Sequence, residues 1–231
     1  MKNLQENILE IQANIEESLD KVGRTKDEVT LIAVTKTVDV DLIQKSLDLG
    51  LNNIGENRVQ ELQRKYEEIG DKATWHMIGH LQTNKVKYIL DKVSLIHSLN
   101  RISLAKELNK RAKDTNKIIE TLIQVNVAEE ESKFGFKTGE VIPFIESILS
   151  MENIKIKGLM TIAPYAEDPE EVRYVFRELR NLKETIESRN YKEVDMKYLS
   201  MGMTNDYKVA IEEGSNMVRI GTALFGKREY K

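Results

Sequence analysis

Compact apolar runs alternate about eight times with helix-like segments along this chain of 231 residues. The runs are short and rich in β-branched residues. They lack the strict alternation of a strand with one face in water, so they predict strands covered on both faces, as in parallel sheets. Eight strand–helix units in series predict an α/β fold, specifically a (β/α)8 TIM barrel. The predicted strands are residues 30–36, 51–57, 74–80, 93–100, 121–127, 155–164, 197–204 and 217–226.

The segments between the runs have helical spacing. One predicted helix has its apolar face at Ile102, Leu104, Ala105, Leu108 and Ala112, and another at Val172, Val175, Phe176, Leu179, Leu182 and Ile186. An open, doubly wound sheet would show the same alternation and stays open as the alternative. The count of eight and the absence of a G-x-G-x-x-G pattern favour a closed barrel. Because no linker or low-complexity segment divides the chain, we expect one domain over residues 1–231.

An extra helix is predicted ahead of the first run. Its apolar residues recur every three or four positions, at Leu4, Ile8, Ile11, Ile15, Leu19 and Val22. We expect this face to pack on the chain's own barrel, and a partner helix is the alternative. Acidic residues throughout this segment argue against a signal peptide or a membrane span, so we expect a cytoplasmic protein.

Composition excludes several classes of function. A net charge of -3 without long like-charge runs gives no footprint for nucleic acid. The chain has no cysteine, which excludes a disulfide, a thiolate nucleophile and a cysteine metal site. Its three histidines lack the helical spacing of metal ligands, so no metal is expected.

Polar residues at the strand ends are the candidate site residues, because parallel barrel strands direct their carboxyl ends to one mouth. The run LIAVTKT (31–37) places Lys36 at its end. Lys36 is either a solvated strand-end lysine or a partly desolvated amine that acts as a nucleophile toward a carbonyl. Further strand-end residues are Asn57, His80, Ser98, Asn100, Asn126, Thr161, Ser200, Thr204, Arg219, Gly221 and Thr222. Asn57 and Thr204 could equally cap the helices that follow them.

The last two strand ends have features of a phosphate site. SMGMT (200–204) and RIGTALFG (219–226) follow the seventh and eighth predicted strands, where barrels often hold a phosphate. Gly202 and Gly221 would permit close approach of backbone N–H groups, and Ser200, Thr204 and Thr222 offer hydroxyls. The alternative is that both glycines serve ordinary turns. A phosphate site together with an amine suits a phosphorylated aldehyde.

Seven stretches, in order, resemble the pyridoxal phosphate homeostasis proteins, single-domain relatives of the alanine racemase barrel. They are AVTKT (33–37), NIGENRVQE (53–61), WHMIGHLQTNK (75–85), SKFGF (132–136), GLMTIAP (158–164), LSMGMTND (199–206) and VRIGTALFG (218–226). The resemblance implies that Lys36 forms a Schiff base with pyridoxal 5'-phosphate. It also implies that the phosphate is held by Ser200, Gly221 and Thr222, with Thr204 a weaker candidate, that Arg219 faces the pyridine nitrogen, and that Asn57 lies beside the cofactor.

One position departs from the family pattern. Many relatives carry a second lysine two positions after the Schiff-base lysine, where this chain has Val38. If that amine helps to pass on the aldehyde, Lys85, Lys133 or the acceptor's own lysine must replace it here; Lys85 and Lys133 could equally be surface charges. His76 and His97 are interpreted as hydrogen-bonded barrel residues, and His80 lies nearest the mouth.

Two functions compete: an amino-acid racemase-like enzyme, and a carrier that holds the cofactor and releases it to apo-enzymes. Racemisation needs an acid or base on each face of the intermediate. Related racemases take one of these from a second domain, for which we expect no room after Gly226. An arginine beside the ring nitrogen also weakens the ring as an electron sink. We therefore predict a monomeric, non-catalytic carrier. A Schiff-base aldolase acting on a sugar phosphate is a third interpretation.

Overall fold

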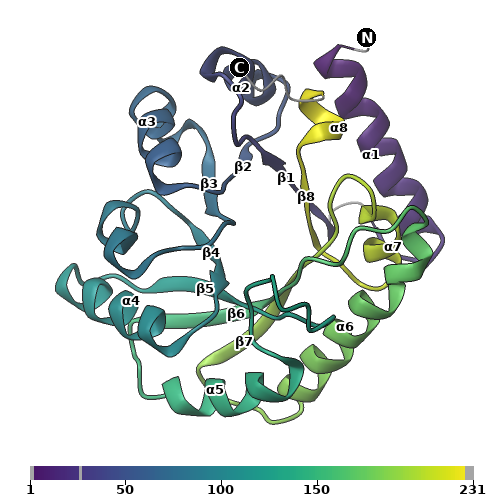
Figure 1. Ribbon diagram of the computed structural model, residues 1–231. Coiled ribbons are helices and arrows are strands. Elements are labelled where there is room, and N and C mark those ends of the chain that lie inside the picture. Colours follow the sequence, from purple (N-terminus) through teal and green to yellow (C-terminus); the bar gives the residue numbers. More distant parts are fainter. Residues whose placement is uncertain (1–2, 26–27, 227–231) are drawn as a thin grey trace.

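Eight parallel strands close into a barrel in chain order, with helices outside it (Figure 1). This computed structural model describes residues 3–25 and 28–226. The strands are β1 (Thr30–Val34), β2 (Asn53–Glu56), β3 (Thr74–Met77), β4 (Leu95–Leu99), β5 (Ile119–Gln124), β6 (Ile154–Met160), β7 (Val194–Ser200) and β8 (Met217–Ile220). The predicted fold class is confirmed. The predicted domain, residues 1–231, extends past the described ranges at both ends and stays a prediction.

The α-helices lie between successive strands or flank them. They are α1 (Leu4–Asp20), α2 (Val40–Asp48), α3 (Val59–Ile69), α4 (Ile102–Asp114), α5 (Val141–Ile148), α6 (Arg173–Glu187), α7 (Tyr207–Glu212) and α8 (Thr222–Phe225). The connection between β3 and β4 contains a 3-10 helix, η3 (Thr83–Tyr88), in place of an α-helix. The eightfold alternation is therefore kept with one crossover that is not α-helical.

The predicted runs are longer than the strands in several places. The run 155–164 leaves the ladder after Met160, but Thr161 and Ala163 remain buried at the mouth. In the run 217–226, Gly221 ends the pairing and the next four residues form α8. An apolar run indicates burial and not strand pairing. Because residues at the mouth of a barrel stay buried after the strand ends, the predicted runs are longer than the strands.

Two apolar layers hold the barrel. The barrel interior contains a small cluster formed by Ile32, Leu95, Leu122, Met160 and Met217. The opposite faces of the strands pack against the helices in a much larger core. Side chains alternate between these layers because successive residues of a strand point to opposite faces.

The N-terminal helix covers the seam where the barrel closes. β1 pairs with β8 through Leu31 with Val218 and Ala33 with Ile220. Helix α1 lies beside α7 and α8 at this side of the barrel (Figure 1). Its buried residues Ile8, Ile11, Ile15 and Leu19 join a cluster with Ile211, Val218, Ile220 and Leu224. The prediction that this helix packs on its own barrel is confirmed.

Candidate functional site

Four neighbouring strands bring the predicted site residues to one side of the mouth. Lys36 and Asn57 follow the ends of β1 and β2, Ser200 ends β7, and Arg219 lies in β8. Because the closed order places β7, β8, β1 and β2 side by side, residues separated by more than 180 positions become neighbours. Thr204 follows β7, while Gly221 and Thr222 follow β8.

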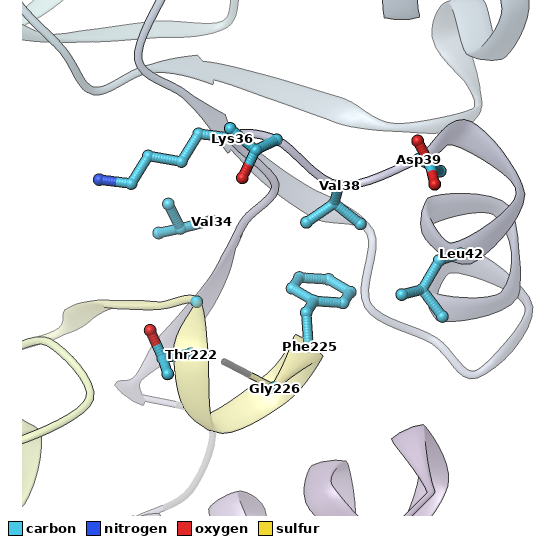
Figure 2. Close-up of a pocket in the computed structure, with 10 residues that line it drawn as sticks. Val34, Lys36, Val38, Asp39, Leu42, Thr222, Phe225 and Gly226 are labelled. Atoms are coloured by element: carbon cyan, nitrogen blue, oxygen red, sulfur yellow. The ribbon is translucent and has the colours of Figure 1, made fainter. Parts of the chain in front are cut away.

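Lys36 is half-buried at the point where β1 leaves the barrel. Figure 2 shows its side chain extending past Val34, with the amine on the side of the Thr222 hydroxyl and away from Val38 and Leu42. A cavity of about 170 Å³ lies between this loop and α8. It is lined by Val34, Lys36, Thr37, Val38, Asp39, Leu42, Gly221, Thr222, Phe225 and Gly226. The structure thus brings together three of the predicted site residues, Lys36, Gly221 and Thr222.

The residues on either side of Lys36 are fixed from β2 and α3. The Thr35 hydroxyl donates to Glu56 at 2.6 Å, and the Thr35 carbonyl accepts from the Lys65 ammonium at 2.7 Å. On the other side, the Thr37 N–H donates to Glu61 at 3.1 Å. Thr37 has a φ of 63°, a left-handed conformation that is strained for a β-branched residue. These contacts determine where the Lys36 side chain leaves the backbone.

The spacing of strand-end residues does not identify Glu56, Glu61 or Lys65. The signal that could have found them is Lys65, which shares the buried face of α3 with Leu62 and Ile69 at helical spacing. A lysine on such a face needs a buried partner, because a lone charge without hydrogen bonds is costly in the interior.

Arg219 lies inside the barrel and is 4% exposed. Its guanidinium donates to the Ser200 hydroxyl at 2.6 Å and to the Thr161 carbonyl at 2.8 Å. Burial lowers the pKa of Arg219 to about 10, an effect opposed by the charge of Asp206. Arg219 is therefore a charged group at neutral pH that can only donate hydrogen bonds.

Ser200 is fully buried against side chains from two other strands. Its hydroxyl contacts Arg219 and, at 2.9 Å, the Nδ1 atom of His97. These two contacts give the Ser200 hydroxyl both a donor and an acceptor, so its hydrogen bonding is satisfied without a phosphate. The phosphate role of Ser200 stays a prediction.

Asn57 carries an unsatisfied polar atom near the mouth. Its side-chain Oδ1 is buried and has no hydrogen-bond partner among the described residues. The N-cap of α3 is Arg58, so Asn57 does not cap that helix. A buried acceptor without a partner costs free energy, which a ligand that donates a hydrogen bond would recover. This acceptor, the Lys36 amine and the donor Arg219 together fit a carbonyl ligand with polar substituents.

The two glycines of the predicted phosphate site have packing roles. Gly202 has a φ of 94°, and an added Cβ would lie 2.7 Å from the Ala210 Cβ. At Gly221, an added Cβ would lie 3.3 Å from both the Cβ and the carbonyl oxygen of Val34. The Thr204 hydroxyl accepts from the Ala223 N–H at 3.4 Å, and α7 begins after Asp206, so Thr204 contacts the first turn of α8 and does not cap α7.

The histidines occupy two environments. His76 and His97 are buried and hydrogen-bonded inside the barrel, as predicted. His80 lies at the mouth with its ring stacked on Phe134, the ring centroids being 4.0 Å apart. Burial, with a smaller contribution from Arg101, lowers the pKa of His80.

The two candidate transfer lysines also differ. Lys133 donates to Glu130 and to the Ala163 carbonyl at 3.1 Å. Lys85 lines an open surface hollow together with Asn57 and His80.

Comparison with known proteins identifies the family. The model of the alanine racemase N-terminal domain matches residues 7–229. The pyridoxal phosphate homeostasis protein of Aquifex aeolicus is 46% identical over 99% of this chain and 100% of its own length. The chain belongs to the pyridoxal phosphate homeostasis protein family.

Solved structures agree with this membership. An unknown protein from Bifidobacterium adolescentis superposes with a TM-score of 0.90 at 33% identity, covering 96% of this chain and 94% of its own. PipY of Synechococcus elongatus, solved with PLP bound, superposes with a TM-score of 0.80 at 29% identity, covering 92% of this chain and 100% of its own.

Over 3–25 and 28–226, no group of three or more histidine, aspartate or glutamate residues is arranged to hold a metal ion. No helix within those ranges has the length and apolarity needed to cross a membrane.

Proposed function

We propose that the chain binds pyridoxal 5'-phosphate as a Schiff base on Lys36 and serves cytoplasmic homeostasis of that cofactor as a monomeric carrier. The observation that carries the proposal is the position of Lys36, whose amine leaves the end of β1 beside Thr222 and Gly221 at the barrel mouth. Support also comes from the family and from PipY, which has been solved with PLP bound.

The residues at the mouth match the parts of this cofactor. The Lys36 amine would add to the aldehyde carbon of the cofactor, with loss of one water. Arg219 would donate to the ring nitrogen, and the Asn57 Oδ1 would accept from a polar substituent. Gly221, Thr222 and Thr204 would hold the phosphate beside the start of α8. The Ser200 hydroxyl, which contacts Arg219 and His97, would hold Arg219 in place beneath the cofactor.

Arg219 favours holding the cofactor over turnover of amino acids. Its guanidinium stays charged at neutral pH, and a fixed positive charge disfavours a proton on a nearby ring nitrogen. Without that proton the ring withdraws electrons weakly, which slows loss of an α-proton. Release to an apo-enzyme needs only an amine that replaces Lys36, and the half-exposed position of Lys36 leaves room for one.

The visible absorption spectrum tests the cofactor. Purified protein incubated with pyridoxal phosphate should show a band that borohydride converts into a stable adduct on Lys36. Lys36→Ala should lack the band, whereas the matched control Lys45→Ala, an exposed lysine of α2, should keep it. Absence of uptake by the unaltered protein would overturn the assignment and favour the aldolase interpretation.

Turnover separates the carrier from the racemase-like alternative. Loaded protein is incubated in D₂O with single amino acids, and α-deuterium is followed by NMR. We expect exchange no faster than with the free cofactor. Robust exchange that Lys36→Ala abolishes would identify an enzyme instead.

A further inference from the structure

A continuous row of hydrogen bonds crosses the barrel interior behind Arg219. From Arg219 in β8 the contacts run to Ser200 at 2.6 Å, to His97 at 2.9 Å and to His76 at 3.1 Å. The last contact joins His76 to the Oδ1 atom of Asn53 in β2 at 3.1 Å. We call these five residues the barrel relay.

Most of the relay is buried beside apolar side chains. Arg219, Ser200, His97 and His76 are each less than 5% exposed. The interior cluster that shares the barrel with them is made of Ile32, Leu95, Leu122, Met160 and Met217. Polar side chains in such surroundings keep their partners, because no water replaces a lost hydrogen bond at low cost.

The direction of every hydrogen bond in the relay follows from Arg219. A guanidinium can only donate, so the Ser200 oxygen accepts from it. The Ser200 proton then needs an acceptor, and of the two side chains that contact this hydroxyl in the described part of the chain, only His97 can accept. His97 must therefore carry its proton on Nε2 and leave Nδ1 bare.

The same assignment of donors and acceptors continues to Asn53 at the far end of the row. The His97 Nε2–H donates to Nδ1 of His76, so His76 also carries its proton on Nε2. That proton is donated to the Asn53 oxygen, which can only accept. Each donor has one acceptor, and both rings are neutral with the same tautomer.

We propose that His97, supported by His76, is a positioning residue for Arg219: its Nδ1 accepts the hydrogen bond from the Ser200 hydroxyl and so turns the Ser200 oxygen toward the guanidinium. The proposal rests on the proposed function, in which Arg219 faces the cofactor ring. It adds that the Ser200 hydroxyl proton is directed into the barrel and is not donated to the cofactor phosphate. The relay thus runs from Arg219 in β8 and Ser200 in β7 to His97 in β4 and His76 in β3, and it ends at Asn53 in β2.

The first test uses protein without cofactor, so it does not depend on the proposed function. ¹⁵N NMR of labelled histidine should show His97 and His76 as neutral rings with the proton on Nε2 at pH 7. A proton on Nδ1 of His97 would overturn the proposal, because Ser200 would then lose its acceptor.

The second test compares two substitutions of similar shape. Asparagine can present an acceptor where His97 has Nδ1, whereas leucine cannot; both remove the contact with His76. We expect His97→Leu to bind pyridoxal phosphate about tenfold more weakly than His97→Asn, the loss of about one charge-assisted hydrogen bond. We also expect the pH midpoint of its visible band to move while that of His97→Asn stays near the unaltered value.

Ser200→Ala completes the design. It should reproduce the His97→Leu effect, and the double variant should add nothing further, since both changes break the same link. Circular dichroism of each variant checks folding. Equal affinities and equal midpoints for the leucine and asparagine variants would overturn the proposal. If the proposed function were wrong, the unaltered protein would show no visible band with pyridoxal phosphate, and the histidine tautomers seen by NMR would be unchanged.

Discussion

The ammonium of Lys65 lies 2.7 Å from the Glu56 carboxylate, and both side chains are fully buried. Both also contact Thr35, the residue immediately before Lys36. A buried ion pair is weak evidence for added stability, since desolvation offsets the attraction. We interpret the pair as a positioning device. Glu56 from β2 and Lys65 from α3 hold the backbone at Thr35, from which the chain continues to Lys36.

Removal of Lys65 should leave the buried Glu56 carboxyl without its counter-charge and without one of its hydrogen-bond donors. We expect Lys65→Met to lower the free energy of unfolding by about 3–5 kcal/mol, measured by urea denaturation. Lys45→Met, at an exposed site of α2, should change it by less than about 0.5 kcal/mol. The double variant Lys65→Met/Glu56→Met should recover part of the loss, because no buried carboxyl is then left without its partner. A Lys65→Met protein as stable as its control would contradict this account of the pair.

Glu56 should make stability depend on pH in an unusual direction. Burial raises the pKa of Glu56 to about 7, an effect only partly opposed by Lys65 and Thr35. Because this folded value exceeds the ordinary 4.5, the folded protein binds the proton more tightly than the unfolded chain. The stability that this proton binding adds to the folded protein is therefore fully present below pH 4.5 and is lost as the pH rises through about 7. Relative to Glu56→Gln, the unaltered protein should gain at most about 3 kcal/mol between pH 8 and pH 4.5. No difference in slope between the two proteins would show that the carboxylate does not titrate there.

His76 should act in the opposite direction. Burial lowers its pKa from 6.5 to about 4, so the unfolded chain binds the proton more tightly. Its contribution to stability is present above pH 6.5 and lost as the pH falls through about 4. Between these values the unaltered protein should lose on the order of 3 kcal/mol more than His76→Gln, which cannot titrate. Urea denaturation at half-unit pH steps measures the difference, and parallel curves would contradict the prediction.

The strands and the position of Lys36 depend on local sequence pattern, and both could be predicted from it. Buried parallel strands are apolar on both faces, so all eight were visible as runs, and Lys36 was notable because an amine ends such a run. The 3-10 helix Thr83–Tyr88 was not predicted, since its lysines and apolar residues do not distinguish it from an α-helix.

Contacts across the barrel could not be predicted. His76 and His97 were interpreted as hydrogen-bonded barrel residues, but the contact between His97 and Ser200 joins positions 103 residues apart. That contact depends on which interior residues of β4 and β7 lie at the same height, and the register of a closed sheet sets this height. The packing of Gly221 against Val34 could not be predicted for the same reason, because Val34 belongs to the strand that closes the barrel with β8.

Alanine substitutions at three glycines test whether each glycine is needed for packing or for ligand binding. Gly202→Ala places a Cβ at a φ of 94° and 2.7 Å from Ala210, so it should cost the most stability. Gly221→Ala brings a Cβ to 3.3 Å from Val34, and we expect a loss of about 1–3 kcal/mol as β8 moves away from β1. Gly139→Ala is the control, because an added Cβ there meets no atom of the described chain within 4 Å.

Denaturant unfolding without cofactor gives the order of stability, and titration with pyridoxal phosphate gives the affinity of each variant. If packing against Val34 is the reason for Gly221, then Gly221→Ala loses stability in the absence of any ligand, and affinity falls because the cavity wall formed by Val34 and Thr222 is displaced. A Gly221→Ala protein with unchanged stability and weakened cofactor binding would instead assign this glycine to the phosphate.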